Sequence, residues 1–353
     1  MAIRTMVLEA QPDKAFMEAN PEVGTFILVV DRGGSKCDAL LCREDGTALA
    51  TGRSGIEDPE GGRSVGGSGR SRRSLERAVS QTLADFSPAF LHHNISPDPG
   101  PPIEPLRGAF QAMWHAVREQ DCPMELAGLE WGMVAIAGTG ALVYARSPEG
   151  REVLLDGLGP ELGDHGGGYQ IGREAMRAAA CSGWSERRRT SLAEPVYRAC
   201  TGESPEESGW RLVDYSLERR DRAEIAALAR IVDREAEKGD SIALRILQSA
   251  AADLAQTVRD AAESAGLLAT PCTVALSGGV GANSRLYAEH LQAVLAEHAP
   301  ALQVVQVKHP PVIGAALVIL RRISGEDYPA RRARLLETAG ELFRTTPQPA
   351  QGG

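Results

Sequence analysis

One short pattern occurs twice in this chain: a strand, a glycine-bearing turn, a strand, a second turn and a third strand. The first copy starts at Thr25 and reads TFILVV, DRGGSK, CDALLCR, an acid–glycine turn and TALATGR. The second copy starts at Met133 and reads MVAIAG, TGALVYAR, SPEG and REVLLDG. Apolar and β-branched runs between such turns are typical of antiparallel meanders. Two copies of one meander predict an internally duplicated fold.

The rest of the chain alternates helix-like and strand-like segments, which indicates an α/β protein. Apolar residues at helical spacing predict a helix over 74–86, and a proline-rich loop follows at 96–105. A further helix is expected over about 105–119, and helices dominate 172–267. Late strands are expected at 273–278 and near 302–307, with a final helix over 312–320. We therefore predict an N-terminal extension, an N-terminal lobe, a C-terminal lobe and a C-terminal tail, at residues 1–23, 24–130, 131–324 and 325–353.

Charge and composition narrow the function. The 353 residues carry a net charge of −9, which disfavours a general nucleic-acid role but still allows backbone N–H groups to hold one nucleotide. No apolar run is long enough for a membrane span, and the acid-containing start lacks a signal peptide's apolar core, so a cytoplasmic location is expected. The six cysteines form no C-x-x-C pair and are expected to be free thiols.

Two glycine turns follow the first strand of each meander. The first reads Asp31-Arg32-Gly33-Gly34-Ser35-Lys36 and the second Gly138-Thr139-Gly140. Glycines let backbone N–H groups approach a phosphate closely, and a hydroxyl can donate to a phosphate oxygen. Asp31 is a candidate Mg²⁺ ligand, because Mg²⁺ prefers carboxylate and phosphate oxygens. Either segment could also be a plain hairpin turn, so the prediction depends on the duplication.

Two more glycine segments follow. Residues 156–172 read DGLGPELGDHGGGYQIG, and so many glycines exclude a regular helix or strand. The segment also carries apolar residues, which a flexible Gly/Ser linker would lack, so a binding loop is favoured. Asp164 in this loop suits sugar hydroxyls, because an ionised carboxylate accepts several hydrogen bonds. Later, LSGGVGAN places Gly278 and Gly279 between a strand and a helix start, a natural nucleotide cradle.

In this order the motifs resemble the BadF/BadG/BcrA/BcrD-type ATPases, which include N-acetylglucosamine kinases. DRGGSKC is similar to the family's D-G-G-G-T-K-T, AIAGTGA to I-x-G-T-G-S, and DGLGPELGDHGGGYQIG to G-G-W-G…G-D-E-G-S-x-Y-x-I-G. LSGGV and PPVIGAALV match the closing S-G-G-V and P-x-x-G-A-A. The resemblance covers roughly 25–320 and implies a two-lobed, duplicated actin/hexokinase-like (ribonuclease H-like) fold with a cleft between the lobes.

The resemblance also implies an ATP-dependent sugar kinase that uses ATP and Mg²⁺ on a hexose or amino sugar. It assigns phosphate and Mg²⁺ to Asp31 and to Gly33, Gly34, Ser35 and Lys36, and phosphate to the second loop with Thr139. It assigns adenosine to Gly278 and Gly279. Sugar contacts fall on Asp58, Gly157, Gly159 and Asp164. The sequence leaves a homodimer open as an oligomeric state.

Several positions depart from the family pattern. Ala141, His165 and Gly167 stand where the family has Ser, Glu and Ser, Leu158 replaces a Trp, and Glu57 or Asp58 lies where a sugar-binding Asn is expected. Each loss removes a polar or stacking contact, and a buried partner left unpaired would raise the cost. A catalytically weakened relative that binds nucleotide or sugar as a sensor is therefore the alternative function.

The catalytic base has two candidates near the end of the first lobe. The family places an Asp about 19 residues before G-T-G, a spacing that Glu119 meets, whereas Asp121 fits the D-x-x-x-x-L-x-G segment better, and we favour Asp121. His165 is a further acid/base by residue type. The family also contains activators of radical dehydratases with a cysteine-held iron–sulfur cluster, but the cysteines of this chain are not clustered.

Overall fold

The computed structural model describes residues 25–33, 36–55, 68–86, 90–95, 111–217 and 222–345. Contacts divide the chain into two compact units, unit 1 with Met1–Cys122 and His309–Gly353, and unit 2 with Pro123–Lys308. The C-terminal segment thus returns to the N-terminal unit, whereas the sequence-based division assigned residues up to 324 to the second lobe and set 325–353 apart as a tail. The short helix α3 (Asp121–Ala127) crosses from one unit to the next.

Unit 1 contains a five-stranded sheet in the order β3-β2-β1-β4-β5. The first three strands form the predicted antiparallel meander, and β4 and β5 extend it in parallel to β1. Apolar residues fill both faces of β1, which suits a central strand covered on both sides. The strands are β1 (Thr25–Arg32), β2 (Lys36–Arg43), β3 (Ala48–Gly55), β4 (Phe90–His93) and β5 (Gln111–Trp114).

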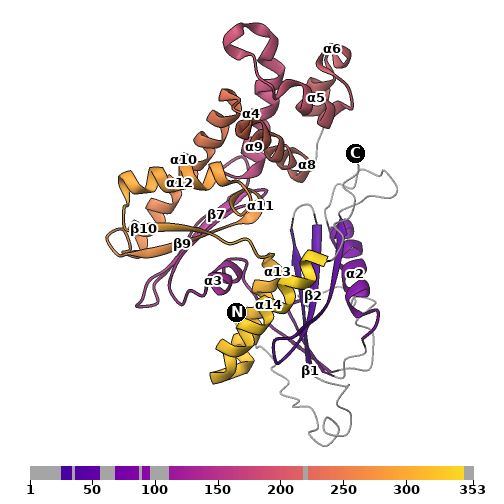
Figure 1. The fold of residues 1–353 in the computed structure, drawn as a ribbon, viewed down its shortest axis with the longest axis vertical. Coiled ribbons are helices and arrows are strands. Elements are labelled where there is room, and N and C mark those ends of the chain that lie inside the picture. The colour runs from indigo at the N-terminus through magenta and orange to yellow at the C-terminus, as the bar shows by residue number, and fades with distance from the viewer. Residues whose placement is uncertain are drawn as a thin grey trace, which may run out of the picture. The chain divides into compact units, whose positions relative to one another are not determined.

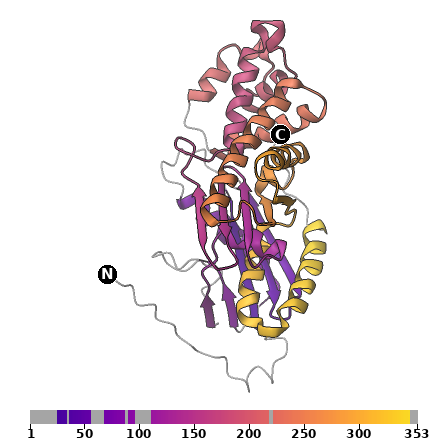
Figure 2. The ribbon, with the colours of Figure 1, turned by 90° about the vertical axis from the view of Figure 1, so that its left-hand side faces the viewer.

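Helices cover both faces of this sheet. On one face, Leu75 and Val79 of α2 (Ser68–Leu83) pack with Phe26, Leu28 and Val30 of β1. Side chains alternate along a strand, so Asp31 points to the opposite face, where α13 (Pro311–Ser324) packs against β1 and β2. The 3₁₀ turn η4 (Gly325–Asp327) leads into α14 (Tyr328–Thr345), which lies against α13 and β3 (Figures 1 and 2).

Unit 2 repeats the sheet of unit 1. Its order, β10-β9-β6-β7-β8, is an antiparallel meander of β6, β7 and β8 extended by β9 and β10 in parallel to β6. The predicted duplication is therefore confirmed at the level of strand order and direction. The strands are β6 (Gly132–Ala137), β7 (Ala141–Arg146), β8 (Glu152–Asp156), β9 (Cys272–Ser277) and β10 (Leu302–Gln306).

Helices make up most of the rest of unit 2, as the sequence predicts. The long helix α10 (Ser241–Ala265) starts at the Asp240 side chain, which accepts from the N–H groups of Ile242 and Ala243, and ends at Gly266 in a left-handed conformation. The other helices are α4 (Gly168–Cys181), η2 (Ser182–Trp184), η3 (Glu186–Arg188), α5 (Ala193–Thr201), α6 (Pro205–Ser208), α7 (Arg211–Leu217), α8 (Arg222–Ala227), α9 (Ala229–Glu237), α11 (Gly278–Gly281) and α12 (Arg285–His298).

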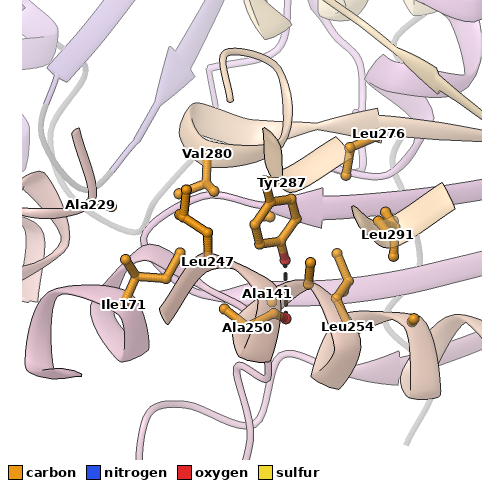
Figure 3. Close-up of a cluster of buried hydrophobic side chains, with 14 of the residues drawn as sticks. Ala141, Ile171, Ala229, Leu247, Ala250, Leu254, Leu276, Val280, Tyr287 and Leu291 are labelled. Atoms are coloured by element: carbon orange, nitrogen blue, oxygen red, sulfur yellow. Dashed lines mark hydrogen bonds between the residues drawn. The ribbon is translucent and has the colours of Figure 1, made fainter. Parts of the chain in front are cut away.

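The core of unit 2 lies where α10 and α12 pack with α4 against the sheet. Leu247 and Leu254 of α10 meet Ile171 of α4 and Leu291 of α12 in one buried cluster (Figure 3). The fully buried Tyr287 crosses this cluster, and its hydroxyl donates to the carbonyls of Gly166, at 2.9 Å, and Ala250, at 3.4 Å. The glycine-rich loop is thereby attached directly to the core.

One secondary-structure prediction was wrong. Residues 111–114, expected within a helix over about 105–119, form the edge strand β5, and 115–120 form no helix. These residues pair with β4, which satisfies their backbone hydrogen bonds in a sheet instead of in a helix. Across the described residues, no helix combines the length and apolarity that crossing a bilayer requires.

Candidate functional site

Strands β1 and β2 of unit 1 carry two carboxylates on one face of the sheet. Asp31 of β1 pairs in register with Asp38 of β2. Asp38 is fully buried and is neutralised by Lys36, whose Nζ lies 2.8 Å from its Oδ2, and by Arg53, which donates to Oδ1. Neither a hydrogen bond nor an ion pair holds the Asp31 carboxylate among the described residues. Within the described part of the chain, Asp31 therefore has no ion-pair partner of its own, which leaves its carboxylate available to a metal ion.

The surroundings of Asp31 change its acidity. Burial, followed by repulsion from Asp38, raises the pKa of Asp31 from the ordinary 3.8 to about 6, while Lys36 opposes the shift and Glu119 adds to it. Burial and then the charges of Asp31, Asp121 and Glu119 also raise the pKa of the Cys122 thiol. The structure thus gathers the predicted metal ligand Asp31 and both candidate bases at one place in unit 1. Shifted carboxyl groups of this kind are common at functional sites.

A first prediction concerns Asp31 and pH. A folded-state pKa above the unfolded value means that the contribution of Asp31 to stability is fully present below about pH 4 and is lost as the pH rises through about 6. Asp31→Asn should therefore be more stable than the wild type by up to about 3 kcal/mol above pH 7, and equally stable near pH 4. Urea unfolding of both proteins across pH 4–8 tests this; a difference that does not grow with pH contradicts it.

Asp121 begins α3 and is held by a neighbour. Arg118 donates from Nε to Oδ2 at 3.0 Å and from Nη2 to Oδ1 at 2.8 Å, which fixes the plane of the carboxylate. The Asp121 side chain is mostly buried, at 14% exposure, whereas Glu119 lies exposed. A fixed and partly shielded carboxylate suits a general base better than an exposed one does.

The second glycine turn lies in unit 2 between β6 and β7. Gly138 N–H donates to the Gly140 carbonyl at 2.9 Å, and the carbonyls of Gly138 and Thr139 accept from the N–H groups of Gly168 and Tyr169, which begin α4. The N–H groups of Thr139 and Gly140 and the Thr139 hydroxyl have no acceptor in the part of the chain that the structure describes. These donors are what a phosphate oxygen requires. In the first turn, by contrast, Gly33 N–H donates to the Lys36 carbonyl.

The junction of β9 and α11 packs directly on this turn. Gly278 has a φ of +89°, and a Cβ there would lie 2.4 Å from the Ala137 carbonyl oxygen and 2.7 Å from the Gly138 nitrogen. Only glycine fits, because both the backbone conformation and the space exclude a side chain. Gly279 is exposed at the start of α11. Unit 2 therefore brings the predicted phosphate turn and the predicted adenosine glycines together.

The glycine-rich loop is organised by an aspartate that the sequence reasoning did not single out. Asp156 accepts from the N–H of Asp164 at 2.6 Å, from the N–H of His165 at 2.8 Å, and contacts His165 Nδ1 at 2.9 Å. Burial alone would raise the pKa of Asp156, but these hydrogen bonds outweigh it and lower that pKa. Gly157 and Gly159 both have positive φ, of 73° and 83°. The position of Asp156 at a strand end before a glycine is the signal that could have indicated this role.

Asp164 joins the loop to the second glycine turn. It is buried, adopts a positive φ of 58°, and its Oδ1 accepts from Ala141 N at 3.2 Å. Its Oδ2 pairs with Arg222, the first residue of α8. Arg222 was missed because it lies 58 residues away in the chain and no local pattern marks it. His165 is exposed, and its ring pairs with Asp156, so it orders the loop.

Three predicted positions, Gly34, Ser35 and Asp58, lie outside the described residues. Among the residues that are described, no three His, Cys, Asp or Glu side chains form a group that could hold a metal ion, and all six cysteines are free. An Mg²⁺ at Asp31 would therefore take its remaining oxygen ligands from phosphate and water, as Mg²⁺ commonly does.

Comparison with known proteins identifies the family. The model of the BadF/BadG/BcrA/BcrD ATPase family matches residues 124–318, more than half of the chain. This chain belongs to that family. An N-acetylmuramic acid/N-acetylglucosamine kinase from Clostridium acetobutylicum is 28% identical to this family member over 220 residues, covering 61% of this chain and 71% of the relative. An N-acetyl-D-glucosamine kinase from Dictyostelium discoideum is 26% identical over 196 residues, covering 55% and 60%.

Solved structures confirm the fold of this BadF/BadG/BcrA/BcrD ATPase. A Chromobacterium violaceum protein provisionally assigned as an N-acetylglucosamine kinase matches with a TM-score of 0.60 at 21% identity, over 85% of this chain and all of that one. Two α/β units with matching five-stranded sheets agree with the actin/hexokinase-like fold that the sequence predicts. Membership of an ATPase family implies ATP as the nucleotide.

Proposed function

We propose that this protein is an ATP-dependent sugar kinase that transfers the γ-phosphoryl group to a hexose or amino sugar, in the manner of N-acetylglucosamine kinases. One observation carries the proposal: in this member of an ATPase family, the donors of Thr139 and Gly140 have no acceptor within the described ranges, and their turn is fixed to α4. The two curated relatives, both amino-sugar kinases, support the substrate class.

The residues of unit 2 fit the nucleotide. The N–H groups and hydroxyl of the 138–140 turn would donate to phosphate oxygens, and the Gly278–Gly279 junction would lie along the adenosine, as the family resemblance implies. The packing of Gly278 on Ala137 and of Gly168 on Gly138 holds these backbone groups in place before a ligand arrives. Preorganised donors cost little to reorganise during the reaction.

The residues of unit 1 fit the metal and the proton transfer. Asp31, half-buried and without an ion-pair partner among the described residues, would hold Mg²⁺, which neutralises phosphate charge when bound. Asp121, oriented by Arg118, would accept the proton from the attacking sugar hydroxyl. Gly157, Gly159 and the Asp164 loop would form the sugar site. Phosphoryl transfer needs mainly positioning and charge neutralisation, which this set of groups supplies.

A coupled assay of ADP release tests the function. Purified protein with Mg-ATP should release ADP faster in the presence of at least one sugar from a panel of glucose, glucosamine, N-acetylglucosamine and N-acetylmuramic acid. Mass spectrometry should then detect the corresponding sugar phosphate. If no sugar raises ADP release above the basal rate, the kinase proposal fails.

A binding-only sensor is the second candidate, and one observation favours it. The Asp164 carboxylate is already bonded to Ala141 N and Arg222, so it is less available to sugar hydroxyls than an open carboxylate. A sensor should bind Mg-ATP or sugar, seen as a rise in melting temperature by mass action, without forming ADP. In that case Asp121→Ala should leave ATP binding unchanged.

A further inference from the structure

The glycine-rich loop and α4 line an open pocket on the surface of unit 2. Its volume is about 240 Å³, and Leu162, His165, Tyr169, Gln170 and Arg173 contribute to its lining. Sites that enclose a whole drug-sized ligand span about 300–1,000 Å³. The pocket therefore suits one substituent of a ligand better than an entire nucleotide or disaccharide.

Arg173 contributes a positive charge to this pocket that no described residue pairs with. Its guanidinium lies over the Tyr169 ring at 5.9 Å from the centroid, and it has neither hydrogen bond nor ion pair among the described residues. Arg222 lies over the same ring at 5.8 Å, but its charge is neutralised by Asp164. Tyr169 thus holds two arginines, of which Arg173 alone is left to bind an anion from outside.

The other polar groups of the pocket either have hydrogen-bond partners already or carry a negative charge. The His165 ring bonds to Asp156, while Gln170 accepts from Gly166 N and donates to Asp253. Glu161 also lines the pocket, but it is exposed, so solvent screens its charge. A ligand group that bonds to Arg173 is therefore best satisfied by being an anion.

We propose that Arg173 is a specificity residue that binds a carboxylate carried by the sugar substrate, so that the preferred substrates are acidic sugars. This inference rests on the proposed sugar-kinase function. The guanidinium fork matches a carboxylate with two parallel hydrogen bonds, and stacking on Tyr169 limits the arginine to few orientations. A phosphate would offer the same chemistry, and ATP is its source in a kinase, so the test must separate the two.

Calorimetric titration with two sugars tests the proposal. N-Acetylglucosamine and N-acetylmuramic acid share one ring, and the second adds a lactyl ether with a carboxylate. Wild-type protein should bind the acidic sugar more tightly. Arg173→Ala should weaken acidic-sugar binding by roughly 10- to 100-fold and leave neutral-sugar binding within about twofold, because only a charge-assisted hydrogen bond is removed. Arg173→Lys should recover part of the loss.

Two variants serve as controls. Arg177 lies one turn further along α4, pairs with Glu174 and is exposed, so Arg177→Ala removes the same charge without touching the pocket and should change neither affinity. Glu161→Gln removes a negative charge from the pocket lining and should strengthen acidic-sugar binding slightly. A fall in affinity for Arg177→Ala as large as that for Arg173→Ala would overturn the specific role of Arg173.

The outcomes separate this inference from the kinase proposal. Arg173-dependent binding of the acidic sugar without ADP release would support the carboxylate site and end the kinase proposal. The opposite result has two parts: neutral sugars raise ADP release equally in wild type and Arg173→Ala, and neither protein prefers the acidic sugar. That result would support the kinase proposal and end the carboxylate assignment. If Arg173→Ala weakens Mg-ATP binding instead, Arg173 holds phosphate and the carboxylate assignment is wrong. If the protein binds neither sugar, the carboxylate assignment is also wrong.

Discussion

Asp121→Asn should lower kcat for sugar phosphorylation by about 10²- to 10⁴-fold, the usual contribution of a positioned general base. Asparagine keeps the shape and one oxygen acceptor for Arg118 but cannot take up the proton of a sugar hydroxyl. The KM for ATP should change little, because Asp121 is not among the residues proposed above to contact the nucleotide or its Mg²⁺. Steady-state kinetics with circular dichroism, to check folding, provide the measurement.

Glu119→Gln is the matched control for Asp121. Glu119 is two residues away, is exposed, and has the spacing from G-T-G that the family favours, so the pair distinguishes the two candidate bases. We expect less than a threefold change in kcat for Glu119→Gln. A large loss in Glu119→Gln, with near-normal kcat in Asp121→Asn, would transfer the role to Glu119.

Gly278→Ala should be among the most destabilising single substitutions in unit 2. A left-handed conformation costs a non-glycine residue about 1–2 kcal/mol, and a Cβ placed 2.4 Å from the Ala137 carbonyl oxygen forces backbone to move at about 1–3 kcal/mol more. The free energy of unfolding should therefore fall by about 2–5 kcal/mol. The affinity for ATP should also fall at least tenfold, because the displaced backbone carries the 138–140 turn.

Gly279→Ala controls for the loss of a glycine at this junction. A Cβ at Gly279 meets no atom within 4 Å, and the residue does not have the positive φ of its neighbour. Its unfolding free energy should change by less than about 0.5 kcal/mol. Urea or thermal unfolding of both variants provides the measurement. Equal stability of Gly278→Ala and Gly279→Ala would show that the backbone at this junction accommodates a Cβ at position 278 at little cost.

Much of the sheet architecture could be read from local pattern. The apolar runs beginning at Thr25 and Met133 each form the first strand of an antiparallel meander, since alternation and turn residues are properties of neighbouring residues. The late strand before Gly278 and the final apolar helix were predicted for the same reason. Edge strand β5 was missed, because its four residues acquire their conformation by pairing with β4.

The C-terminal segment illustrates a second limit. Helix α14, within residues expected to form a tail, packs on β3, and Arg334 and Thr338 contact the 45–48 segment nearly 290 residues earlier in the chain. Four of its 18 residues are arginines, so its sequence alone resembles that of a solvated segment. The sequence does not show which distant segment such a helix packs against.

Residue identity and order along the chain were enough to predict the meanders and the family, because both depend on the spacing of near neighbours, whereas the acids named as catalytic or metal-binding remain predictions. Folding settled which groups those residues meet: Asp164 pairs with Arg222, Asp31 lies beside Asp38, and Arg173 lies over the Tyr169 ring. Such pairs form when helices and strands from distant parts of the chain pack together, and packing is a three-dimensional property that local pattern does not encode.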